Sequence, residues 1–106
     1  MKAMHKVIVA LTATILAGQA MAVSDSNKTV QSAGVQSPNA YFRVNEALSA
    51  NCNFNVIYIG DLSTPGARAM YATVLSAQAT GKPLTTITYN VASTGECTAT
   101  QVEVSS

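Results

Sequence analysis

From position 39 onward, hydrophobic and polar side chains recur in short regular patterns. Over 40–44 they alternate with a period of two, which is typical of a half-buried strand, and Tyr41 and Arg43 lie on the polar side. Over 54–59 both faces carry apolar side chains, which predicts a central strand. Residues 84–91 and 97–104 are predicted to form two strands joined as a hairpin by the turn at 93–96.

The last predicted strand changes its pattern part of the way along. Cys97 and Ala99 have the opposite parity to Val102 and Val104. A strand that keeps one face buried throughout needs one extra residue to restore the alternation. The pattern therefore predicts a bulge, or burial of both faces of this strand.

Between the second and third predicted strands, apolar residues are spaced three and four apart, which predicts one helix over about 65–80. Ser63 and Thr64 offer hydroxyl groups for the N-cap, and Pro65 suits the first helical position. Gly81 suits the left-handed residue that ends a helix. The helix should therefore pack one face on the sheet.

The order strand, strand, helix, strand, strand predicts an α+β fold: a small antiparallel sheet with one helix packed on it. We expect the sheet to curl toward an OB-like barrel. The residues expected in the core are apolar positions on the inward faces of these elements: Phe42, Val44, Phe54, Val56, Ile57, Met70, Val74, Leu75, Ile87 and Val102.

Residues 1–22 have the features of an export signal. Lys2 and Lys6 precede an apolar run, and Ala20 and Ala22 supply the small residues that a signal peptidase reads. The apolar stretch is about a dozen residues, shorter than the about 20 that span a bilayer, so we expect cleavage after Ala22 and no retained anchor. The mature protein is then periplasmic or secreted.

The mature chain is predicted to have two parts. Residues 23–38 are rich in Ser, Asn, Gln and Gly and are expected to be a flexible leader, with a short edge strand around 30–35. Residues 39–106 are expected to form a single domain stapled by a disulfide.

Removal of the signal changes the composition in a way that excludes several function classes. The mature chain keeps no histidine, the commonest general base and metal ligand. Four basic side chains remain against five acidic ones, a formal charge of −1. Isolated cations on such a surface cannot make the several phosphate contacts that drive nucleic-acid binding. We therefore expect no nucleic-acid partner, no metal and no cofactor.

Cys52 and Cys97 are the only cysteines, an even number in an exported chain, and are predicted to form a disulfide. The bond would close a loop of about 45 residues around the strand–helix–strand unit, worth about 4 kcal/mol on the chain-entropy model. A redox-active pair would need closer spacing and an electropositive setting. A zinc site would need further carboxylate ligands.

The candidates for catalysis are few. Glu46 follows a strand, Asp61 precedes the predicted helix and Glu96 lies in the hairpin turn. Nothing in the spacing brings Glu46 or Glu96 to Asp61 as a glycosidase pair. A simpler hypothesis is that Asp61 complements the helix N-terminus. No Ser-x-x-Lys motif offers a nucleophile with its base. We therefore expect a protein that is not an enzyme, with a hydrolase using Asp61 or Glu96 as a third hypothesis.

An exposed sheet face is the expected binding surface, because OB-like sheets bind ligands there. Arg43 would supply a charged donor among hydroxyl and amide groups, a mixture suited to acidic or hydroxylated glycans. The competing interpretation is an ordinary solvated face, in which threonines occur because they suit strands. The candidate ligand-binding residues are polar or amphipathic: Tyr41, Arg43, Asn53, Asn55, Thr86, Thr88 and Tyr89.

Several stretches carry a family resemblance: 59–72, which reads IGDLSTPGARAMYA; 75–82, which reads LSAQATGK; and Gly95-Glu96-Cys97. Over 41–104 the chain resembles a class of short exported proteobacterial proteins in which these features recur in this order. That class is similar to the binding subunits of pertussis-like and subtilase-like toxins, small disulfide-bonded OB-like barrels with one helix that form glycan-binding rings. The serine-centred sugar pocket of the toxin subunits has no counterpart here that can be matched residue by residue.

Two function classes lead. The first is an exported, non-enzymatic binding or interaction module with a glycan or protein partner, for which a homo-oligomer is expected. The second is a small periplasmic inhibitor or accessory protein that acts as a monomer. Oligomeric state distinguishes the two.

Overall fold

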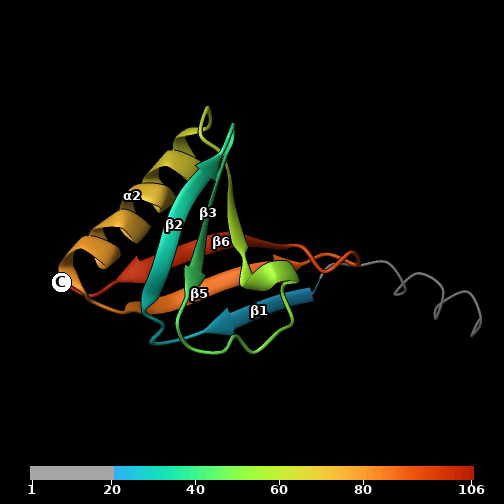
Figure 1. Ribbon diagram of the computed structural model, residues 1–106, viewed down its shortest axis with the longest axis horizontal. Coiled ribbons are helices and arrows are strands. Elements are labelled where there is room, and N and C mark those ends of the chain that lie inside the picture. The colour runs from blue at the N-terminus through green and yellow to red at the C-terminus, as the bar shows by residue number, and fades with distance from the viewer. Residues whose placement is uncertain (1–20) are drawn as a thin grey trace, which may run out of the picture.

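The structure, a computed structural model, describes residues 21–106. It contains a sheet of six strands and one helix of 16 residues (Figure 1). The elements in chain order are β1 (Met21–Asp25), β2 (Val30–Gln36), β3 (Asn39–Val44), the 3-10 turn η1 (Asn53–Asn55), β4 (Ile57–Asp61), α2 (Pro65–Thr80), β5 (Leu84–Val91) and β6 (Cys97–Val104).

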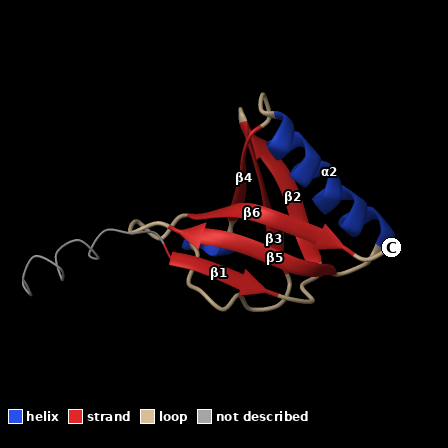
Figure 2. Ribbon diagram, turned by 180° about the vertical axis from the view of Figure 1, so that it is seen from behind, coloured by secondary structure: helices blue, strands red, loops and turns tan. Residues whose placement is uncertain are grey.

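The strands are ordered β1-β5-β6-β4-β3-β2 across the sheet. All neighbours are antiparallel except β4 and β6, which pair in parallel at Ile57–Cys97 and Tyr58–Thr98. Figures 1 and 2 show β2, β3 and β4 running steeply across the direction of β1, β5 and β6, with α2 beside β2. The α+β prediction is confirmed. The OB-like barrel is not confirmed, because β1 and β2 remain two separate edges and the sheet does not close.

The predicted leader, 23–38, contributes two strands. The edge strand expected around 30–35 is confirmed as β2, which pairs with β3. The rest of the segment differs from a flexible leader, because Val23 to Asp25 pair with β5 and Val23 packs against the core. β1 begins at Met21, so it takes in the last two residues of the predicted signal, and the other residues of that signal lie outside the described part of the chain.

The predicted strand 54–59 begins later than expected. Phe54 and Asn55 have φ of 58° and 55°, so the chain turns through η1 before β4 starts at Ile57. This left-handed turn takes Phe54 out of the alternation, and its side chain is 85% exposed. Its prediction as a core residue is wrong, whereas Val56 and Ile57 are buried.

The helix begins and ends where its terminal residues predict. Pro65 is the first helical residue after Thr64, which stays extended. The expected hydroxyl cap is not formed, because the Thr64 hydroxyl donates to the Asp61 carbonyl at 2.8 Å instead. Gly81 has φ of 71°, and its N–H and that of Lys82 donate to the carbonyls of Gln78 and Ala77. This left-handed cap satisfies carbonyl groups that the helix leaves unpaired.

The buried stripe of α2 consists of Ala67, Val74 and Ala77, and these side chains allow close packing on the sheet. Leu75 follows Val74 by about 100° around the helix and points away from this stripe, with 40% of it exposed. Its prediction as a core residue is wrong, and Met70 is only half-buried. Within the described residues, no helix is long and apolar enough to cross a membrane.

The bulge predicted in the last strand is confirmed. Thr88 pairs with Gln101 and Tyr89 pairs with Ala99, so Thr100 is the extra residue on β6. Cys97 and Ala99 are buried before it, and Val102 and Val104 pack against the core after it. The single extra residue restores the buried face.

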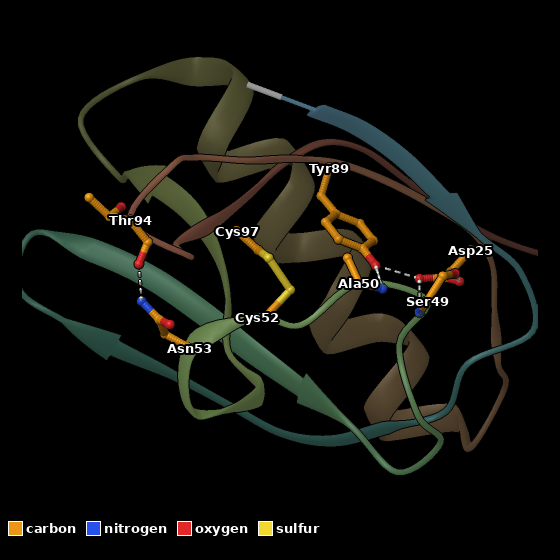
Figure 3. Close-up of a disulfide and its surroundings, with 8 residues drawn as sticks. All are labelled: Asp25, Ser49, Ala50, Cys52, Asn53, Tyr89, Thr94 and Cys97. Atoms are coloured by element: carbon orange, nitrogen blue, oxygen red, sulfur yellow. Dashed lines mark hydrogen bonds between the residues drawn. A yellow bond between two sulfur atoms is a disulfide. The ribbon is translucent and has the colours of Figure 1, made fainter. Parts of the chain in front are cut away.

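The disulfide between Cys52 and Cys97 is confirmed (Figure 3). The Cα atoms of the two cysteines are 5.5 Å apart. Cys97 begins β6 and Cys52 immediately precedes η1, so the bond ties the η1 turn to the hairpin. A periplasmic or secreted location is compatible with this bond.

Asp25 is a buried carboxylate that joins three segments. It accepts hydrogen bonds from the Tyr89 hydroxyl at 2.6 Å, from the Ser49 backbone N–H at 3.2 Å and from the Ser49 hydroxyl (Figure 3). Burial acts to raise the pKa of Asp25, but these hydrogen bonds together outweigh it and lower the pKa below 3.8. Burial and the bond to Asp25 raise the pKa of Tyr89 to about 12.

The Asp25→Asn variant is expected to lose about 1–3 kcal/mol of stability at neutral pH, because the acceptor for Tyr89 and Ser49 is weakened. Since folding lowers the pKa of Asp25, its contribution is present above about pH 4 and is lost as the pH falls through the folded-state pKa. Urea unfolding at neutral pH and below about pH 3 should therefore show a smaller acid-induced loss in the variant than in the wild type. Equal losses in the two proteins would contradict this role for Asp25.

Candidate functional site

A hollow of about 490 Å³ opens over β2, β3 and β4. Phe42 of β3 is buried in the core with residues of α2, so Tyr41 and Arg43, which alternate with it, face away from the helix. The hollow thus lies on the sheet face opposite α2. Val35, which pairs with Ala40 and so shares the face that carries α2, borders the hollow at the edge of the sheet. The lining of the hollow is mainly aromatic and apolar: Val35, Gln36, Tyr41, Arg43, Phe54, Val56 and Tyr58.

Tyr41 is held in place by its neighbours on both sides. Its ring lies over Gly34 of β2, where a side chain's Cβ would come within 2.8 Å of the phenol oxygen. On the other side it meets the ring of Tyr58, with centroids 6.3 Å apart and planes tilted by 60°. This tilted arrangement is a favourable aromatic contact. The two tyrosines therefore form a fixed floor.

Arg43 is the charged group of the hollow. Its guanidinium carbon lies 5.5 Å from the centroid of the Tyr41 ring, a cation–π contact, and its Nε donates to the Phe54 carbonyl at 3.3 Å. The two terminal nitrogens make no hydrogen bond to another residue within 21–106. They are free to donate to a ligand, and a carboxylate is the group that suits two parallel donors.

Phe54 forms an exposed wall of the hollow, on a turn that is anchored from both ends. The Asn53 N–H donates to the Gly95 carbonyl at 3.0 Å, and the Asn53 side-chain amide donates to the Thr94 carbonyl at 3.0 Å. Cys52 next to it is bonded to Cys97. A left-handed conformation costs a residue such as Phe54 about 1–2 kcal/mol, and its exposed ring recovers little of this by burial.

The structure separates the residues that the sequence grouped as one binding face. It brings Tyr41 and Arg43 together in the hollow. Asn53 holds the η1 turn, and Asn55 lines a second depression of about 310 Å³ beside the loop 44–51. Thr86 and Thr88 lie on β5, where their hydroxyls bond to side chains of Glu103, Gln101 and Ser24.

Tyr89, predicted to be exposed, is fully buried. It shares a face of β5 with Ile87, and this face forms the core. Its hydroxyl donates to Asp25 and accepts from the Ala50 N–H at 3.4 Å, so the polar end of the ring is satisfied inside the protein. Tyr89 therefore does not contribute to an exposed binding surface.

Five residues of the hollow were not predicted as binding residues. Phe54 and Val56 were expected in the core, Tyr58 in the predicted strand 54–59, and Val35 and Gln36 in the leader. The Asn-Phe-Asn sequence at 53–55 was the available indication for Phe54, because asparagine favours turns and tolerates the left-handed region.

The acidic candidates make local hydrogen bonds. Asp61 accepts the Ser63 N–H at 2.8 Å in the turn that leads into α2, and this bond lowers the pKa of Asp61. The side chain of Glu46 accepts two bonds from Thr29, which lower its pKa. Glu96 lies in the hairpin turn, where its carbonyl accepts the Ala92 N–H. Within the described part of the chain, no three His, Cys, Asp or Glu side chains gather as metal ligands would.

Comparisons of the chain with protein-family models, with curated proteins and with solved structures found no match.

Proposed function

We propose that the protein is an exported, non-enzymatic binding module that captures a glycan or protein ligand through the aromatic hollow. The observation that carries the proposal is Phe54, a large apolar side chain that is 85% exposed on an unfavourable backbone conformation. Residues in sparsely populated conformations cluster at ligand-binding sites, where the strain serves function.

The ligand chemistry follows from the lining of the hollow. Aromatic rings at Tyr41, Phe54 and Tyr58 suit the apolar face of a sugar ring or an apolar side chain. The free guanidinium nitrogens of Arg43 suit a carboxylate. The proposed ligand therefore carries an acidic group next to an apolar surface, as an acidic glycan or an acidic segment of a protein does. The resemblance to glycan-binding toxin subunits is part of this proposal.

The Phe54→Gly variant separates binding from stability. Glycine adopts the left-handed conformation without strain, so the free energy of unfolding is expected to stay unchanged or to rise by up to about 1 kcal/mol. Affinity for the ligand should fall at least about tenfold, as it should in Arg43→Gln. Thr86→Ala, on the other half of the sheet, is the matched control and should bind like the wild type.

A glycan array that includes sialylated sugars, together with a set of acidic peptides, identifies the ligand for this comparison, and calorimetry measures the affinities. If nothing in either set binds the wild type, or if Thr86→Ala reduces binding as much as Phe54→Gly does, the hollow is not the binding site. The lining would then be an ordinary solvated sheet face.

A periplasmic inhibitor or accessory protein is the second candidate. An exposed Phe54 on a turn next to the disulfide is the observation that favours it, because such a side chain can enter the pocket of a target protein. An inhibitor of this kind acts as a monomer, so light scattering on the mature protein discriminates between the two candidates.

A further inference from the structure

β2 is the less protected of the two edges of the sheet. It pairs with β3 on one side only and lies at the end of the strand order (Figures 1 and 2). An edge strand of this kind turns the N–H and C=O of every second residue outward, where they can pair with another strand. The other edge, β1, has five residues and directs the carboxylate of Asp25 inward.

The sequence of β2 lacks most of the devices that usually prevent edge pairing. It reads VQSAGVQ, seven residues without a charged side chain or a proline. Val35 is 48% exposed on this strand. The one irregularity is at the start, where Gln31 is left out of the register between Val30 and Ser32. The regular edge therefore runs from Ser32 to Gln36.

We propose that two copies of the chain associate by antiparallel pairing of β2 with β2 about a two-fold axis. A two-fold interface places the same strand against itself, so any charge on the strand would face a like charge in the other copy. β2 has none, which makes the second copy a suitable partner. The pairing joins the two sheets into one continuous sheet.

The register follows from the length of the regular edge. Centring the axis on Gly34 uses all five residues from Ser32 to Gln36. It places Ala33 opposite Val35 of the second copy, on the face that carries α2. The exposed part of Val35 is then covered by an apolar neighbour, and burial of this apolar surface favours association.

The opposite face gives the dimer a functional consequence. Tyr41 lies over Gly34, so the two copies bring their tyrosine rings to the axis, and their hollows lie on the same face of the joined sheet. The dimer thus presents two equivalent hollows on one side. The pairing itself rests on β2 alone and stands whether or not the hollow binds a ligand.

Light scattering and sedimentation of the mature protein over a range of concentrations test the pairing. The wild type should be a dimer, and Val35→Lys should raise the dissociation constant at least about tenfold, because lysines protect edge strands from pairing. Leu75→Lys is the matched control, since it introduces the same charge at a similarly exposed apolar residue of α2. It should remain a dimer.

Gln36→Lys is a second edge variant. Because Gln36 is polar and exposed, this substitution should not disturb the fold, and it should weaken the dimer as well. Circular dichroism shows whether each variant is folded. A wild type that is monomeric at all concentrations overturns the proposal, as does a dimer that survives both edge substitutions. Rings or larger assemblies overturn it too, because they require head-to-tail pairing through a second surface.

Discussion

Replacing both cysteines, Cys52→Ala with Cys97→Ala, is expected to lower the free energy of unfolding by about 4 kcal/mol. The two residues are 45 apart in the sequence, and the loop between them contains β4, α2 and β5. Opening this loop restores chain entropy to the unfolded state. Since small domains are stable by only about 5–15 kcal/mol, this loss removes a large part of the total.

Urea and thermal unfolding of the double variant measure this effect, and a fall in Tm of about 20 °C corresponds to the expected loss for a domain of this size. The wild type in the presence of a reductant is the matched control and should approach the double variant. Intact-mass analysis before and after reduction establishes that the bond is present. A double variant within about 1 kcal/mol of the wild type would contradict the role assigned to the disulfide.

Val74→Asp is expected to prevent folding. Val74 is fully buried on α2 between the helix and the sheet, so the variant would place a carboxylate in the core without a partner. The cost of burying such a group is several kcal/mol, comparable with the whole stability of the domain. Chemical-shift dispersion in an NMR spectrum and resistance to proteolysis report the loss.

Leu75→Asp is the matched control, because it introduces the same carboxylate at the adjacent residue, where 40% of the side chain is exposed. This variant should fold. If Val74→Asp is as stable as the wild type, or if both variants unfold equally, the buried face of α2 has been wrongly assigned.

The elements that the sequence predicted well are those with chemically distinct ends or strict parity. Pro65 and Gly81 suit only a few backbone positions, so they located both ends of α2. The parity change between Ala99 and Val102 predicted a bulge, or burial of both faces, because the buried face of a strand must be continuous. The structure places the bulge at Thr100.

The errors arose where tertiary contacts decided the outcome. The segment 23–38 has the composition of a leader, yet Val23 and Asp25 find partners on β5 and in the core. Helical spacing did not separate Leu75 from Val74, because the two differ only in which of them faces the sheet.

The candidate site was predicted only in part, because tertiary contacts also determine which of its residues are exposed. Alternation placed Tyr41 and Arg43 on an outer face, and they line the hollow. Phe54 was assigned to the core because a local sequence does not reveal that two consecutive residues adopt the left-handed conformation. Tyr89 was expected outside because the buried acceptor that satisfies its hydroxyl, Asp25, is 64 residues away in the sequence.

The most direct test of the binding hypothesis is to map an acidic ligand on the mature protein by NMR. We would titrate the isotope-labelled protein with sialyllactose, with lactose as the control that lacks the carboxylate, and with acidic peptides in parallel. The proposal predicts that at least one acidic ligand shifts the resonances of Tyr41, Arg43, Phe54 and Tyr58, and that Phe54→Gly abolishes these shifts. Acidic ligands that leave these residues unperturbed, or that perturb only β1 and β5, would contradict it.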